Sequence, residues 1–175
     1  MHRTDSQPCG IARCGLRDGQ FRGEMCSTSA VASIRRNVRI QRPASAVWGV
    51  VGDPSTIHHW FPGIANSVVE GKVRTITLNS GIPLPEDIVT LDPILRRFQY
   101  KIAGGLFRSH LGTIDVLELD DESCMVVYGT DAEPDVMALV IGGAAGGALD
   151  ELKRQFEAGE HDHLSTPAST TSKDK

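Results

Sequence analysis

The polar side chains best placed for chemistry are those that an alternating strand pattern directs toward the protein interior. Arg36 shares the parity of the apolar residues in 34–40, and an inward guanidinium would bind a carboxylate or phosphate group. The alternative is a side chain that reaches back to water or pairs with a helix carboxylate such as Glu151. The sequence leaves both interpretations of Arg36 open.

Tyr100 and His110 are also predicted to face inward, from two later strands. Tyr100 lies between Phe98 and Ile102 on one strand face, where its hydroxyl would bond either a bound molecule or the backbone. His110 shares the parity of Ile114, and its imidazole would titrate near neutral pH as an acid or base. No Ser or Cys is predicted to face inward beside His110 as a nucleophile. We therefore expect His110 to line the mouth of an internal cavity as a polar residue and not to act in catalysis. We assign no catalytic residue.

The histidines and cysteines do not follow the spacing of a metal site. His58 and His59 would diverge on a helix, and we expect one to be buried and the other exposed. His161 and His163 lack a third ligand nearby. The cysteines at positions 9, 14, 26 and 124 contain no CxxC pair. We therefore predict no metal and no other cofactor.

Composition predicts one globular domain. The chain has 175 residues, of which 40% are hydrophobic and 23% charged, enough for a single core. The net charge of −4 argues against nucleic-acid binding, which a basic surface would favour. No apolar run reaches the roughly 18 residues of a membrane span, and no secretory signal is visible. We expect a cytoplasmic protein.

The periodic patterns lie between two polar segments. Residues 1–30 mix Arg, Gly, Ser and Asp without an apolar face, so we expect a disordered leader, with Met25 as an alternative start. Residues 159–175 are rich in Ser and Thr, and we expect a disordered tail. The domain is predicted to span residues 31–158.

The elements that position the candidate side chains follow a simple order. A strand at 34–40 precedes two short helical segments, and about six further strands lead to a long helix at 134–158. Consecutive strands with short loops form an antiparallel sheet that curls. We predict an α+β helix-grip fold: a curved sheet of six to seven strands wrapped around the C-terminal helix.

The long helix combines an apolar face with an unusual run of glycines. That face is predicted to contain Val136, Val140, Ala144, Ala148, Leu152 and Phe156. Glycines 142, 143, 146 and 147 each cost about 1 kcal/mol relative to alanine. They would permit close packing on the sheet, or leave room for a ligand, and both interpretations stay open. Their spacing does not match the G-x-G-x-x-G nucleotide motif.

Residues 31–158 resemble the helix-grip superfamily of START-like (SRPBCC) proteins. This group includes Bet v 1 proteins, steroidogenic lipid-transfer domains and bacterial polyketide cyclase/dehydrase-type proteins. The string RPASAVWGVVGDPSTIHHWFPGI is similar to its signature of a proline, a V-W helix and a second helix ending in tryptophan. The resemblance implies a bacterial protein that binds a lipid, polyketide or isoprenoid-like molecule in an internal cavity.

The apolar stretch SGIPLPED, residues 80–87, is predicted to be a loop that closes this cavity. Apolar loop side chains such as Ile82 and Leu84 cost solvation unless they cover something, whereas Glu86 is expected to be exposed. Its first four residues resemble the gate loop of plant abscisic-acid receptors. That likeness implies a latch arginine at Arg108, with Phe107 in place of the latch histidine.

The same likeness places His59 where the receptors have a lysine for the ligand carboxylate, and Phe61 at a pocket-lining aromatic. The predicted ligand-binding set is Arg36, His59, Phe61, Ile82, Leu84, Tyr100, Arg108, His110, Ile114, Val140 and Ala144.

Three functions compete. The first is binding or transport of a small hydrophobic ligand in a gated cavity. The second is a cyclase/dehydratase-type enzyme on a polyketide-like substrate. The third is an interaction module whose gate surface binds a protein partner once ligand is bound; the sequence does not identify that partner. The lack of a catalytic triad, metal-ligand set or phosphate loop in the sequence favours binding.

Overall fold

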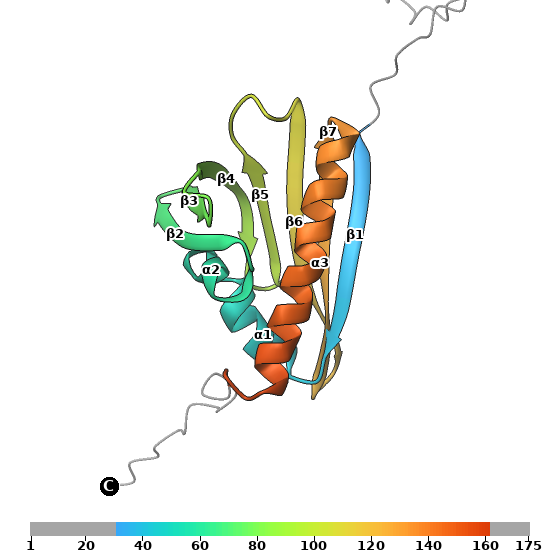
Figure 1. Cartoon of the computed structure of the whole chain (residues 1–175). Coiled ribbons are helices and arrows are strands. Elements are labelled where there is room, and N and C mark those ends of the chain that lie inside the picture. The colour runs from blue at the N-terminus through green and yellow to red at the C-terminus, as the bar shows by residue number, and fades with distance from the viewer. Residues whose placement is uncertain (1–30, 162–175) are drawn as a thin grey trace, which may run out of the picture.

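A seven-stranded antiparallel sheet and one long helix form the body of the protein (Figure 1). The computed structural model describes residues 31–161, so the predicted leader, Met25 and His163 lie outside the described residues. The strands are β1 (Ala32–Ile40), β2 (Ile64–Glu70), β3 (Val73–Leu78), β4 (Pro83–Asp92), β5 (Arg97–Ile102), β6 (Ser109–Asp120) and β7 (Ser123–Glu133). The helices are α1 (Ala44–Val51), the 3-10 helix η1 (Pro54–Thr56), α2 (Ile57–Trp60) and α3 (Asp135–Glu157).

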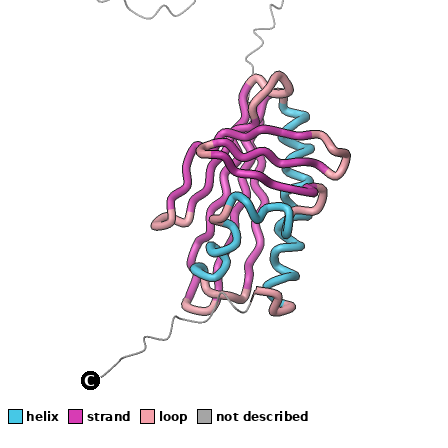
Figure 2. The backbone as a smooth tube through the Cα atoms, turned by 90° about the vertical axis from the view of Figure 1, so that its left-hand side faces the viewer, coloured by secondary structure: helices cyan, strands magenta, loops and turns pink. Residues whose placement is uncertain are grey.

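The strand order is β1-β7-β6-β5-β4-β3-β2, so β1 and β2 are the two edges. Every neighbouring pair is antiparallel. Figure 2 shows from the side that the strands do not share one plane, and that one set runs across the other. The helix α3 lies along the sheet near β1 and β7, and the short helices α1 and α2 lie beside its C-terminal half (Figure 1). The predicted helix-grip fold is confirmed.

The stretch SGIPLPED is mostly strand, which corrects the predicted loop. Pro83 begins β4, and Leu84 and Glu86 pair with Ile76 and Arg74 of β3. Prolines lack the N–H donor of a strand ladder, which is why the sequence indicated a loop. Both prolines lie at the start of β4. The carbonyl of Pro85 still accepts a hydrogen bond of 2.8 Å from the N–H of Ala103, which follows β5.

A short turn at 79–82 remains of the predicted loop. The N–H of Leu78 donates to the carbonyl of Ile82 at 2.9 Å, which closes the β3–β4 hairpin. Gly81 has a φ of +84°, a value that favours glycine over other residues.

The buried face of α3 agrees with the predicted one in the second half of the helix, at Ala148, Leu152 and Phe156, and differs from it in the first half. Val136 and Val140 are exposed, and the buried positions are Ala138, Gly142, Ala145, Ala148, Leu149, Leu152, Gln155 and Phe156. A Cβ on Gly142 would lie 2.7 Å from Cγ2 of Ile34, so this glycine lets α3 approach β1 closely. Gly143 and Gly147 are exposed, with nothing within 4 Å of a Cβ. None of the four glycines lines the cavity described below, and Gly142 fits the interpretation of close packing on the sheet.

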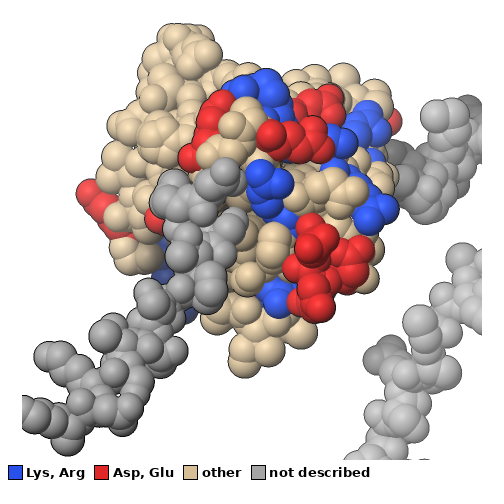
Figure 3. Space-filling view, turned by 90° about the horizontal axis from the view of Figure 1, so that it is seen from below, with Lys and Arg blue, Asp and Glu red and all other residues tan. Residues whose placement is uncertain are grey.

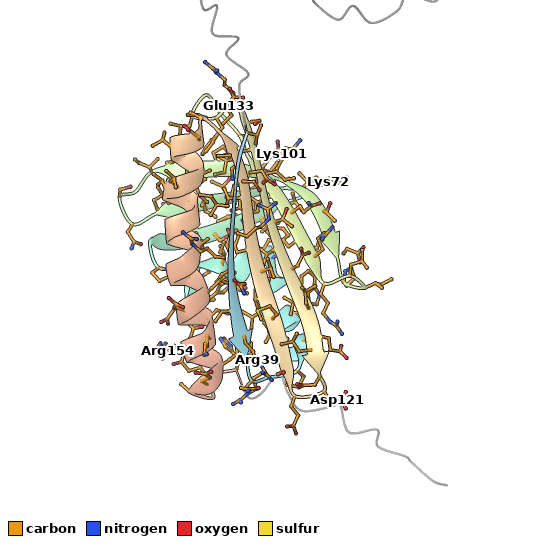
Figure 4. All side chains as sticks on the ribbon, turned by 90° about the vertical axis from the view of Figure 1, so that its right-hand side faces the viewer. Arg39, Lys72, Lys101, Asp121, Glu133 and Arg154 are labelled. Carbon is orange, nitrogen blue, oxygen red and sulfur yellow. The ribbon has the colours of Figure 1, made fainter. Side chains whose placement is uncertain are left out.

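Charged side chains are mixed over the outside of the body. Figure 3 shows basic and acidic residues interspersed over the lower end. The charged residues labelled in Figure 4 lie at the ends or outer side of the sheet and helix, and Arg39, Lys72, Lys101, Asp121 and Arg154 are exposed. Among residues 31–161, no helix is long and apolar enough to cross a membrane.

Candidate ligand-binding cavity

A cavity of about 410 Å³ lies between the inner side of the sheet, α2 and the first half of α3. Small-molecule sites have volumes of about 300 to 1,000 Å³ and mostly apolar walls with a few polar groups. The polar side chains in this wall are Glu86, Tyr100 and Tyr128. The apolar lining comes from Ile57, Phe61, Pro62, Ile64, Ile76, Leu78, Ile82, Leu84, Ile102, Leu106, Phe107, Met137, Val140, Ile141 and Ala144, with Gly63 between them.

The structure brings six of the predicted residues together around this cavity: Phe61, Ile82, Leu84, Tyr100, Val140 and Ala144. They come from the end of α2, the β3–β4 hairpin, β5 and α3. The strand and helix patterns therefore converge on one space, although the chain separates these residues widely.

Arg36 does not reach the cavity. Its strand, β1, is the sheet edge under α3, so an inward side chain meets the helix. The Nε of Arg36 donates to the Gly142 carbonyl at 3.2 Å, and the residue is exposed. The alternative of a side chain that reaches water fits this placement, although its partner is a helix carbonyl and not Glu151.

His59, Arg108 and Ile114 also lie away from the cavity wall. His59 is exposed, and its carbonyl accepts a hydrogen bond of 2.8 Å from Gln155. The side chain of Arg108 is 79% exposed and pairs with Glu133 at 2.9 Å. Ile114 is fully buried in the core of the sheet.

His110 is buried beside the cavity and does not line it. Its Nδ1 accepts the N–H of Ile102 at 3.1 Å, and its ring packs 5.4 Å from that of Tyr100 and 5.0 Å from that of Phe107. The Nε2 has no hydrogen-bond partner among the described residues. Burial lowers the pKa of His110 to about 4, so the predicted titration near neutral pH is wrong.

The polar centre of the cavity wall is a buried ion pair that the sequence interpretation missed. Arg74 Nε lies 2.6 Å from Glu86 Oε2, and the two side chains are 1% and 2% exposed. The guanidinium of Arg74 lies 4.8 Å from the ring centroids of both Phe98 and Tyr100, a cation–π arrangement. Burial raises the pKa of Glu86, and the charge of Arg74 opposes that shift. Glu86 is thus no exposed loop carboxylate.

Two tyrosines complete this polar centre. The hydroxyls of Tyr100 and Tyr128 lie 2.6 Å apart, which is a strong hydrogen bond. Burial raises the pKa of Tyr100 well above its usual range and that of Tyr128 to about 12, so both phenols stay protonated at neutral pH. Their single mutual bond uses one of two hydroxyl protons.

The signal for Arg74 was present in the sequence. Arg74 shares strand parity with Ile76 and Leu78 in KVRTITLN, which is the same argument that placed Arg36 inward. Glu86 was hidden because two prolines made its strand look like a loop.

A curled sheet, a long helix and an apolar cavity between them define a helix-grip domain of the kind that binds hydrophobic ligands. Residues 31–157 match the family described as polyketide cyclase / dehydrase and lipid transport, and the chain belongs to this family. The predicted superfamily is confirmed. No curated protein is similar enough in sequence to count as a match.

Solved structures share the fold. XoxI from Bacillus cereus is 24% identical over 74% of this chain and 99% of its own, with a TM-score of 0.69. The aromatase/cyclase ZhuI from a Streptomyces species is 17% identical over 78% of this chain and 100% of its own, with a TM-score of 0.63. Norcoclaurine synthase from Thalictrum flavum is 16% identical over 73% of this chain and 94% of its own, with a TM-score of 0.59.

Proposed function

We propose that the protein binds and carries a small hydrophobic molecule, such as a lipid, polyketide or isoprenoid, in this cavity. The observation that carries the proposal is a space of about 410 Å³ whose wall is apolar except for three side chains. Apolar walls give up few hydrogen bonds with water when a ligand enters. The transfer of a hydrophobic ligand from water into such a space is favourable in free energy. The family description, which includes lipid transport, supports the same conclusion.

The β3–β4 hairpin acts as the gate of this cavity. Ile82 is 55% exposed at the turn and Leu84 is half-buried behind it, and both line the cavity. Pro83 and Pro85 flank Leu84, and their fixed φ angles limit how far the hairpin can rearrange. Small movements of the turn would cover or uncover the bound molecule.

Native mass spectrometry of the protein purified from its own host tests the proposal. We expect a noncovalent complex whose extra mass is that of a hydrophobic molecule, lost on organic extraction. A protein that carries no such mass, and takes up none when lipids and aromatic polyketides are added, would contradict the proposal.

Catalysis on the bound molecule is the second candidate, favoured by the Arg74–Glu86 pair and the two tyrosine hydroxyls at the cavity wall. These groups would polarise a carbonyl and move a proton. The molecules extracted from wild type and from Tyr128→Phe separate the two candidates. Equal masses indicate a carrier, whereas a precursor of different mass on the variant indicates an enzyme.

A further inference from the structure

We propose that the cavity selects an uncharged ligand with a hydroxyl or carbonyl oxygen and rejects a carboxylate. Among the described residues, the one charged residue of its wall is already neutralised by a buried partner. The inference rests on the proposed function, since it concerns which hydrophobic molecule the cavity takes. It opposes one of the two interpretations that the sequence left open for Arg36, in which an inward guanidinium binds an acidic group of the ligand.

The first step is the charge balance. Among the described residues of the wall, Glu86 is the only carboxylate and no lysine, arginine or histidine is present. Arg74 neutralises Glu86 at 2.6 Å. A ligand carboxylate placed beside Glu86 would be a second buried anion next to a single cation. Like charges at short range in a poorly hydrated site repel strongly, and the ligand would also lose its own hydration.

The second step is that no other cation in the described part of the chain is placed to compensate. Arg36 bonds a carbonyl of α3 and is exposed, and Arg108 pairs with Glu133 outside the cavity. Ile82, Leu106 and Val140, at the exposed rim, are apolar. His110 is neutral at pH 7, because burial lowers its pKa to about 4.

The third step is the hydrogen-bonding capacity of the wall. Glu86 has a second carboxylate oxygen, and the pair of tyrosines has a second hydroxyl proton. Behind the wall, Nη2 of Arg74 has no partner among the described residues. The polar centre thus contains both an acceptor and donors. A hydroxyl group matches both kinds, a carbonyl matches the donors, and a carboxylate matches only the donors while adding charge.

Equilibrium dialysis with naphthalene, naphthol and naphthoate at neutral pH tests the inference on the full chain. The three share one ring system, and under these conditions naphthol is neutral whereas naphthoate is ionised. We expect naphthol to bind at least about tenfold more tightly than naphthoate, which corresponds to about 1.4 kcal/mol. Naphthalene should bind with intermediate affinity.

The variant Glu86→Gln keeps the side-chain shape and leaves the charge of Arg74 uncompensated. The ratio of naphthol to naphthoate affinity should then fall about tenfold or more, in favour of the anion. The matched control is Asp115→Asn, which removes a carboxylate from the pair with Arg97 (2.6 Å) on the outer face and should leave the ratio unchanged.

Binding of the three compounds to the wild type tests the preference for a neutral ligand even if Glu86→Gln does not fold. Naphthoate affinity equal to or above that of naphthol would overturn the inference, and naphthalene binding in the same assay would show that the proposed function stands. An unchanged ratio in folded Glu86→Gln would also overturn it. If wild type bound none of the three compounds, the proposed function would fail, and the inference would fail with it.

Discussion

At the scale of single residues, Arg74 and Glu86 differ in whether they can become neutral when the other member of the ion pair is removed. A buried carboxylate can take up a proton, and burial already raises the pKa of Glu86, whereas an arginine stays charged under all ordinary conditions. Removal of one member of a buried pair costs about 3–5 kcal/mol when the other remains charged. The two single variants should therefore differ in stability.

We predict that Glu86→Leu lowers the free energy of unfolding by about 3–5 kcal/mol, and that Arg74→Met lowers it less, because Glu86 can become neutral. Urea unfolding of both variants at neutral pH measures the difference. Equal losses, or a larger loss for Arg74→Met, would show that Glu86 does not protonate when it is left alone.

His110 should make stability depend on pH. Its pKa falls from 6.5 in the unfolded chain to about 4 in the fold, so the unfolded state binds more protons between these values. Its contribution is present above pH 6.5 and is lost as the pH falls toward 4, up to about 3 kcal/mol.

The test compares urea unfolding across this pH range. His110→Asn keeps an acceptor for the Ile102 amide and should flatten the curve. His59→Asn, at an exposed histidine, should not. Parallel pH profiles for wild type and His110→Asn would contradict the assignment.

At the scale of elements, the β3–β4 turn should control how long a ligand stays bound. Truncating Ile82 and Leu84 removes apolar contact that a ligand would bury, and about 1.4 kcal/mol corresponds to tenfold in rate. We predict that Ile82→Ala/Leu84→Ala releases a fluorescent hydrophobic probe about tenfold faster than wild type in stopped-flow, with a smaller change in the entry rate.

The matched control is the β4–β5 turn, where Ile94 and Leu95 are 87% and 62% exposed and do not line the cavity. Ile94→Ala/Leu95→Ala should leave release unchanged. If both double variants released the probe at the wild-type rate, the β3–β4 turn would have no gating role.

Substitution by alanine should have opposite effects on stability at two glycines of α3. Gly147→Ala adds helix propensity at an open position and should stabilise the protein by up to about 1 kcal/mol. Gly142→Ala places a methyl group 2.7 Å from Cγ2 of Ile34 and should destabilise it. Thermal unfolding checks both, and stabilisation by Gly142→Ala would show that α3 and β1 are not closely packed.

At the scale of the whole molecule, the patterns along the chain predicted the elements and their order, but not how sharply the sheet curls. The alternation of apolar and polar residues correctly predicted that Tyr100 faces inward, because the direction of a strand side chain depends on local sequence position. It could not show that β1 is an edge under α3, and this edge position takes Arg36 away from the cavity. The burial of Glu86 depends on pairing across β3 and β4, which the prolines concealed.

The central claim is that the space beside α3 takes up a hydrophobic molecule. Ala144 lines this space, whereas its neighbour Gly143 does not line it and has nothing within 4 Å of a Cβ. Fluorescence titration with the neutral dye phenylnaphthylamine should therefore give the same affinity for wild type and Gly143→Phe, and an affinity about tenfold lower or more for Ala144→Phe, whose ring fills the space. Equal dye affinity for all three folded proteins, or no binding by wild type, would contradict the claim.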